Sequence, residues 1–429
     1  MKNILSYLFI FLLCSIGVAQ KKQNHFVVFG GTAHLGNGKI IENAVIAVNN
    51  GTFEMVGSAK GLKLNPAAYD TVYYVEGKHI YPGLINPNNV LGLHDAESVR
   101  ATRDFSEIGH INPHIRTLIA YNTDNAIIPT IKTNGILYTQ CTPRSGLISG
   151  SSSIMALEGW NWEDAVLKAD DGIHLNLPQM SSARPEKEGE QGSPASKKYT
   201  DDKNYMEKFF MDALAYAHSS SNQEKNIRFE AMRGIFTGKS NLYIHTEKAR
   251  DILVAIDLVK NYGIKKAVIV GGKESYKVTK ELKKNKIPVM LNRVHDLPDR
   301  ADEAVDLMYS LPALLQKDSI LFCLQLEGDM EAAQSRNLPF NAGTAIAYGL
   351  TKEESLASVT LNAAKIIGID NKVGSLEDGK LASFIISEGD LFDIRTNNIQ
   401  FAWIAGKKVD LNNKQTELYN RYKTKYGIK

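Results

Sequence analysis

Apolar and polar positions alternate in a regular order through the middle of the chain. Seven short apolar runs recur between positions 83 and 326, namely GLIN, GILYTQC, GIHLNL, NLYIH, KAVIVGG, IPVML and SILFCLQL. Between them lie stretches such as 246–263 and 274–286, where apolar residues recur every three or four positions. Continuous apolar strands that alternate with amphipathic helices are typical of a parallel sheet covered by helices. The pattern predicts an α/β fold with a closed (β/α)8, TIM-like barrel.

The two ends of the chain show a different pattern. From His25 to Val75, β-branched and aromatic residues form short runs between turns that contain Asn and Gly, as in GNGKIIENAVIAVNNGTFEMVG. The same pattern returns near the carboxyl end in KLASFIISEGD, IQFAWIAG and KKVDL. Short strands on both sides of a long middle section predict one discontinuous β-sandwich built from both chain ends.

The first residues have the pattern of a secretory signal peptide. Lys2 precedes an apolar run from Ile4 to Ile16, and small residues follow, with cleavage predicted after Ala19. The run is shorter than the roughly 20 residues that span a bilayer, and no later segment reaches that length. We therefore predict an exported protein, periplasmic or secreted, without a membrane span.

These patterns predict four parts and one insertion. The segment PQMSSARPEKEGEQGSPASKKYTDDKN is polar and rich in Ser, Pro and charge, which favours a long surface loop. The predicted boundaries are 1–19 for the signal peptide, 20–81 for the first part of the sandwich, 82–377 for the barrel with its polar insertion at about 178–204, and 378–429 for the second part of the sandwich.

Composition narrows the class of protein and its partners. Hydrophobic residues make up 43% of the chain and charged residues 23%, which excludes disorder as the main state. The 50 Lys and Arg nearly balance the 47 Asp and Glu, so electrostatics does not favour nucleic acid as a partner. After cleavage only Cys141 and Cys323 remain, both in apolar runs, and we expect buried free thiols.

Several segments resemble one known family. VEGKHIYPGLINP is similar to the junction at which amidohydrolase-superfamily proteins, especially the imidazolonepropionase-like group, leave the sandwich and enter the first barrel strand. GKSNLYIHTEKARDI resembles the family's fifth strand and the helix after it, and LNAAKIIGIDNKVGSLEDGKLASFIISEGD its exit from the barrel. The resemblance implies a hydrolase of non-peptide or cyclic C–N (amide) bonds with divalent metal at the carboxyl-terminal mouth of the barrel.

The resemblance also implies which residues would form the metal site. The family's first-strand His-x-His falls on Asn88 and Val90, and its sixth-strand histidine falls on Gly271, so these ligand positions are degenerate. His245 matches the fifth-strand histidine, and His174 lies near the position of a metal-bridging lysine. Since valine and glycine side chains offer no ligand, we expect at most one divalent metal, zinc, in a reduced site.

The residue for the catalytic position follows the last strand. The family's eighth-strand aspartate, both ligand and base, falls in LQLEGDM, where Glu327 is preferred on register and Asp329 is the alternative. A different site could also be rebuilt from the acidic and histidine-rich segment 94–114, although such residues are more often solvated or capping groups.

Substrate-binding residues are predicted in TPRSGLISGSSSIM. Gly146, Gly150 and Ser151 could offer backbone N–H groups to a ligand, or form a tight turn into a helix. Arg144 could bind a carboxylate, or lie on the rim.

Two functions stay open from the sequence. The first is an exported hydrolase of amide bonds with a reduced or rearranged metal site. The second is a catalytically inactive barrel that binds a small ligand or a partner in its cleft. The barrels of the family often associate, so a homo-oligomer is compatible with either function.

Overall fold

The computed structural model describes residues 25–428, apart from 97, 180–193, 220–223 and 329. The predicted signal peptide, 1–19, lies outside this part of the chain. Among the described residues, no helix has the length and apolar character needed to cross a bilayer.

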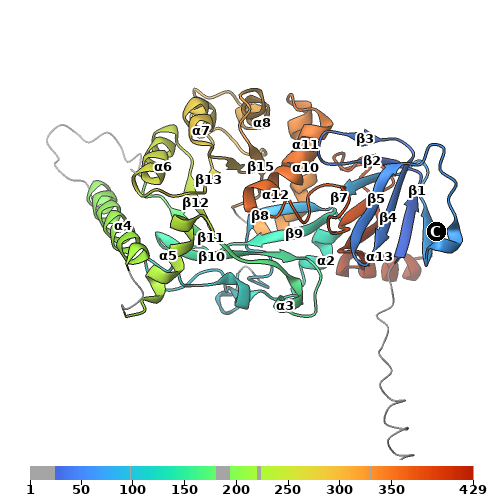
Figure 1. Cartoon of the computed structure of the whole chain (residues 1–429), viewed down its shortest axis with the longest axis horizontal. Helices are drawn as coiled ribbons and strands as arrows, with labels where there is room; N and C mark the ends of the chain where they lie inside the picture. Colours follow the sequence, from blue (N-terminus) through green and yellow to red (C-terminus); the bar gives the residue numbers. More distant parts are fainter. Residues whose placement is uncertain (1–24, 97, 180–193, 220–223, 329, 429) are drawn as a thin grey trace, which may run out of the picture.

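The centre of the molecule is an eight-stranded sheet with its strands in sequence order (Figure 1). Seven of the strands coincide with the apolar runs of the sequence, and the TIM-like barrel is confirmed in this form. Cys141 and Cys323 are buried in these strands as free thiols. The strands are β8 (Leu84–Asn89), β9 (Ile136–Cys141), β10 (Ile148–Ala156), β11 (Val166–Asn176), β12 (Asn241–Thr246), β13 (Ala267–Gly271), β14 (Val289–Leu291) and β15 (Phe322–Leu324).

The sheet departs from a regular (β/α)8 barrel at β10. This strand pairs antiparallel with both β9 and β11, whereas the other pairs are parallel. Gly150 and Ser151 lie inside this strand, so the expected turn into a helix is wrong. The sequence analysis did not predict this strand, because its Gly and Ser residues have low strand propensity. Here they are buried between two neighbouring strands.

The sheet also has a seam between its first and last strands. In the described part of the chain, no hydrogen-bonded ladder joins β8 to β15. Residues 331–360 fill the seam instead. The Ile85 N–H donates to the Val359 carbonyl at 2.9 Å, and the Asn86 amide donates to Ser335 Oγ at 2.8 Å.

The helices follow the strands as the amphipathic pattern predicts. The stretch 246–263 forms α6, which buries Ile252, Ala255 and Ile256 at helical spacing. Helix α11 begins with a capping box between Thr351 and Glu354. The helices are α2 (Ile128–Lys132), α3 (Trp162–Ala165), α4 (Pro194–His218), α5 (Ile227–Thr237), α6 (Ala249–Asn261), α7 (Thr279–Asn285), α8 (Leu307–Lys317), α9 (Glu331–Gln334), α10 (Leu338–Ala347), α11 (Lys352–Ser358), α12 (Leu361–Ile367) and α13 (Lys414–Lys425).

The predicted polar insertion is corrected in part. Positions 180–193 lie outside the described residues, but 194–204 begin α4, which extends to His218. Apolar residues farther along this helix, Met206, Phe210 and Ala213, recur at helical spacing and are buried. They anchor a helix that the polar first turns did not indicate.

Two further sheets lie at the end of the molecule opposite α4 (Figure 1). Their cores merge around Phe26, Phe384 and Trp403, whose stacked rings come from both ends of the chain. The division of the chain into barrel and sandwich domains stays a prediction. One sheet has the order β5 (Thr52–Ser58), β4 (Ala44–Asn49), β1 (His25–Phe29), β6 (Thr71–Tyr74), and the other β18 (Lys407–Lys408), β17 (Ile399–Ile404), β16 (Phe384–Ser387), β7 (His79–Pro82), β2 (Thr32–His34), β3 (Ile40–Ile41).

Candidate functional site

Five predicted residues meet at the carboxyl-terminal end of the barrel strands. Asn88 is the next-to-last residue of β8, Arg144 follows β9, and Glu327 follows β15. His174 and His245 lie near the ends of β11 and β12. Because parallel strands end on the same side, their last residues converge at the mouth. A β-bulge in β8 and a φ of +49° at Asn88, which asparagine tolerates better than most residues, turn this side chain toward Glu327.

The two predicted imidazoles and the predicted carboxylate form a row. His174 Nδ1 lies 3.0 Å from His245 Nε2, and His245 Nδ1 lies 3.6 Å from Glu327 Oε2. On its other side, His174 Nε2 lies 2.9 Å from Ser152 Oγ. Each ring nitrogen of His245 faces a different neighbour. The sequence therefore identified three residues that lie together, but they are linked in series and do not point at one common centre.

Arg144 lies among the residues at the predicted ligand positions. Its Nη1 donates to Asn88 Oδ1 and its Nη2 to the Asn88 carbonyl, each at 3.0 Å. Nη2 also donates to both oxygens of Glu331, at 3.1 and 3.0 Å, and Nε lies 3.9 Å from Glu327 Oε1. The side chain is only 18% exposed. Of the two alternatives for Arg144, the exposed rim position is wrong, because this guanidinium is largely buried at the mouth.

Burial and the guanidinium set the pKa values at the mouth. Burial alone would raise the pKa of Glu327, but Arg144, His245 and Asn88 together hold it well below its usual value. Burial dominates at Glu331 and raises its pKa despite the contact with Arg144. Burial, with His245 and Arg144 nearby, lowers the pKa of His174 well below its usual value, which favours the neutral ring.

Asp171 is a further buried carboxylate, and it is linked to this row through Ser152. It accepts hydrogen bonds from Ser152 Oγ at 2.6 Å, Tyr243 OH at 2.5 Å and Gln140 Nε2 at 3.0 Å. Burial raises its pKa. The sequence analysis missed Asp171. The available signal was an acidic residue directly before the apolar run GIHLNL.

Glu247 lies against Gly271, the position at which the resemblance places the family's sixth-strand histidine. Gly271 has a φ of +96°, and a Cβ atom there would collide with the Glu247 carboxylate. Glu247 Oε2 accepts the Lys273 N–H at 2.9 Å, and burial raises the pKa of Glu247 to about 7. This residue was also missed, although it follows His245 by two positions.

The other predicted substrate-binding residues mainly make internal contacts. The Ser151 N–H donates to the Ile115 carbonyl at 2.8 Å, and a Cβ atom on Gly150 would crowd the same carbonyl. The Gly146 carbonyl accepts from the Asn176 amide at 2.8 Å. These contacts hold β10 and its preceding turn in place.

Two cavities are lined by segments that follow the barrel strands on the mouth side. One, of about 370 Å³, is lined by the loops after β8 and β9, including Arg103 and His114, and by Ser149 of β10. The other, of about 290 Å³, is lined by the loops after β12, β13 and β14, including Glu247 and Lys273. Neither of these two cavities is lined by His174, His245 or Glu327.

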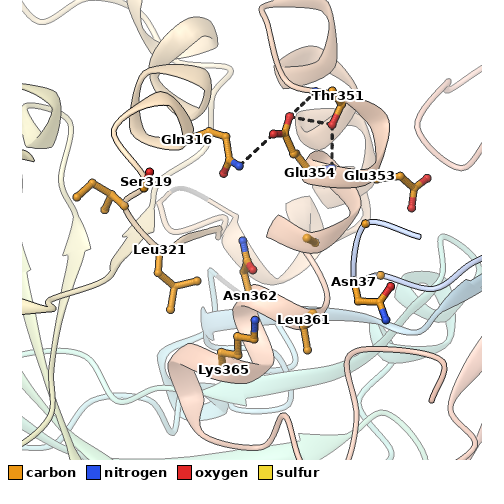
Figure 2. Close-up of a pocket in the computed structure, with 14 residues that line it drawn as sticks. Asn37, Gln316, Ser319, Leu321, Thr351, Glu353, Glu354, Leu361, Asn362 and Lys365 are labelled. Carbon is orange, nitrogen blue, oxygen red and sulfur yellow. Dashed lines mark hydrogen bonds between the residues drawn. The ribbon is translucent and has the colours of Figure 1, made fainter. Parts of the chain in front are cut away.

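A larger cavity, of about 510 Å³, lies at the other end of the barrel (Figure 2). Ser319 and Leu321 line it just before β15 begins, whereas Glu327 follows the end of that strand. Figure 2 shows Gln316, Thr351 and Glu354 hydrogen-bonded at its edge. Because TIM-barrel sites lie at the carboxyl ends of the strands, this cavity is not the candidate site.

The residues present do not fit the expected divalent metal. Among the described residues, no group of three or more His, Cys, Asp or Glu is placed to hold an ion, and this includes segment 94–114 apart from Glu97. Val90 is buried in the apolar core, and Asn88 offers its amide oxygen to Arg144. Asp329, the alternative to Glu327, lies outside the described residues.

The fold and the buried polar mouth define the class as TIM-like barrel proteins, and comparisons with known proteins support a family of hydrolase type. The model of the amidohydrolase family matches residues 210–409. An imidazolonepropionase from Erwinia tasmaniensis is 47% identical over 53 residues, 12% of this chain and 13% of that protein. The matched stretch thus spans only about an eighth of this relative's length.

Solved structures are similar over nearly the whole chain. An amidohydrolase from Thermotoga maritima aligns with a TM-score of 0.73 and 24% identity, covering 90% of this chain and 99% of that one. A prolidase complexed with N-methylphosphonate-L-proline aligns with a TM-score of 0.55 and 14% identity, over 90% and 99% of the two chains. At these identities the structures show a shared fold. Together with the family model, which matches just under half of the chain, they support membership of the amidohydrolase superfamily.

Proposed function

We propose that this chain is an amidohydrolase-superfamily barrel that binds a small polar ligand at its mouth and does not carry out metal-dependent hydrolysis. The observation that carries the proposal is the replacement of the ligand positions. Asn88, Val90 and Gly271 stand where the family has imidazoles by resemblance, and Arg144 is hydrogen-bonded at the first of them. A site that has lost several ligands loses much of the roughly 10–16 kcal/mol that well-built zinc sites provide.

The two cavities on the mouth side indicate where such a ligand would bind. Their volumes, about 370 and 290 Å³, are near the lower end of the range for small-molecule sites, roughly 300–1,000 Å³. Arg103, Arg116 and His114 line one of them, and Lys248 and Lys273 line the other. Acidic side chains line both cavities as well, with Asp104 and Glu107 in the first and Glu247, Glu274, Asp299 and Glu303 in the second. Charged groups of both signs favour a small polar ligand that can both donate and accept hydrogen bonds.

The test measures binding and turnover on the same purified protein. The mature chain is incubated with a panel of N-acyl amino acids and cyclic amides, with EDTA and then with zinc or manganese. We expect saturable binding of at least one compound by calorimetry and no turnover in either condition. Turnover that rises with added metal would overturn the proposal.

Hydrolysis of C–N bonds is the second candidate, and one specific observation favours it. His174, His245 and Glu327 survive as a contiguous row at the mouth. The matched relatives are imidazolonepropionases, and one structural neighbour is a prolidase. His245→Ala distinguishes the two candidates. A hydrolase would lose turnover and bound metal in this variant, whereas the binding protein that we propose would have neither to lose.

A further inference from the structure

Arg144 is hydrogen-bonded to residues on both sides of the seam between β8 and β15. It follows β9, and it bonds to Asn88 at the end of β8 and to Glu331 at the start of α9, beyond β15. Glu327, which also follows β15, lies on its other side. Since β8 and β15 share no hydrogen-bonded ladder in the described part of the chain, this guanidinium connects two edges that the backbone leaves unpaired.

The neighbours of Arg144 are oxygen acceptors that would otherwise attract a cation. They are the Asn88 side-chain and backbone oxygens and the carboxylates of Glu327 and Glu331. Glu331 is 8% exposed at its side chain, and Asn88 is fully buried. Buried carboxylates need a cation or a proton close by, because the charged form is poorly solvated there. A planar guanidinium meets this need for Glu331 with two hydrogen bonds.

We infer that the Arg144 guanidinium takes the place of the metal cation as the fixed positive charge of the mouth. This inference rests on the proposed function, because it presumes a mouth without a resident metal. The guanidinium supplies the positive charge that a metal ion would otherwise supply to these oxygen atoms. The positive charge is covalently attached to the chain, so it is present at any metal concentration, and it ties β8 to the segment after β15.

The test removes the charge and asks whether a metal ion can replace it. Arg144→Met in the full mature chain leaves Asn88, Glu327 and Glu331 around a space without a cation. We expect its melting temperature to fall by at least about 5 °C, because breaking a buried ion pair costs several kcal/mol. Zinc or manganese chloride should recover a measurable part of that loss in the variant and leave the wild-type chain unchanged.

Three further variants separate this role from simple packing. Arg144→Lys keeps the charge, and we expect it to show no response to metal. Arg144→Met with Glu331→Gln removes one acidic group along with the cation, and we expect it to melt higher than Arg144→Met alone without metal. Arg116→Met is the matched control, because Arg116 pairs with Asp170 at an exposed position, and we expect no response to metal from it.

The outcomes are distinct from those of the proposed function. An Arg144→Met chain that responds to divalent metal no more than the wild type overturns the inference and leaves the proposed function standing. If this variant folds only when zinc is present, the inference is supported. If it fails to fold with and without zinc, the inference is contradicted. A wild-type chain with stoichiometric bound metal would instead contradict the proposed function.

Discussion

At the level of single residues, Glu247 occupies the space that a side chain at position 271 would need. By resemblance, the family has a histidine at that position. A histidine at position 271 would meet the Glu247 carboxylate and would also require a φ of +96°, which side chains other than glycine rarely adopt. The carboxylate in turn accepts the Lys273 N–H. The glycine and the glutamate therefore fit together as a pair.

The pKa of Glu247 gives a test of this arrangement. Its pKa is raised to about 7 in the folded chain from the ordinary 4.5, so the folded state holds the proton more tightly than the unfolded state. The resulting stabilisation is full below about pH 4.5 and is lost as the pH rises through 7. We expect Glu247→Gln to stabilise the protein more at pH 8 than at pH 5, by about 1–3 kcal/mol in urea unfolding. An equal effect at both pH values would contradict this account.

At the level of elements, the seam between β8 and β15 depends on side chains. The Asn86 amide donates to Ser335 Oγ, and both groups are buried. Ser335 in turn donates to the Glu331 carbonyl, which links the seam to the residues around Arg144. These side-chain contacts, with the backbone bond from Ile85 to Val359, therefore hold β8 where the other neighbouring strands of the sheet are joined by backbone ladders.

Ser335→Ala tests the seam. The substitution leaves the buried Asn86 amide without this acceptor, and we expect a loss of about 1–3 kcal/mol in the free energy of unfolding. Ser219→Ala is the control, because the exposed Ser219 hydroxyl donates to the nearby Tyr216 carbonyl, and we expect a change within about 0.5 kcal/mol. Similar losses in the two variants would show that the seam has no special role.

A histidine pair joins the second sheet to the barrel helices. His34 of β2 contacts His79 of β7 at 3.2 Å and Glu353 of α11 at 2.6 Å. Burial, with His34 and Lys352 nearby, lowers the pKa of His79. The folded state thus binds a proton at His79 less readily than the unfolded state, and the stability that is present above pH 6.5 is lost as the pH falls below it.

His79→Gln removes this dependence on pH. We expect the free energy of unfolding of the wild type to fall more steeply from pH 7 to pH 5 than that of the variant, by up to about 1.4 kcal/mol per pH unit. Lys352→Met should raise the pKa of His79, which can be followed by NMR. Parallel pH profiles for the wild type and His79→Gln would show that this junction does not titrate.

At the scale of the whole molecule, local sequence patterns predicted the strands better than the contacts between residues far apart in the chain. Runs such as 135–141 and 241–245 became β9 and β12 because apolar periodicity determines strands that are buried on both faces. The ion pair between Arg144 and Glu331 joins residues that are 187 positions apart. No local pattern indicates such a pair. The sequence therefore indicated Arg144 as a residue that could bind a carboxylate, but it did not indicate Glu331 as the carboxylate or Glu247 as the neighbour of Gly271.

The measurement that tests the account most directly is the metal content of the wild-type chain. The protein is purified without chelator from cells supplied with zinc, manganese and iron. Its metal content is measured by plasma mass spectrometry, and its melting temperature is measured with and without EDTA. We predict well below one metal ion per chain and no change of melting temperature with EDTA. One or more ions per chain, with a melting temperature that falls when EDTA removes them, would contradict the central claim that Arg144 has replaced the metal.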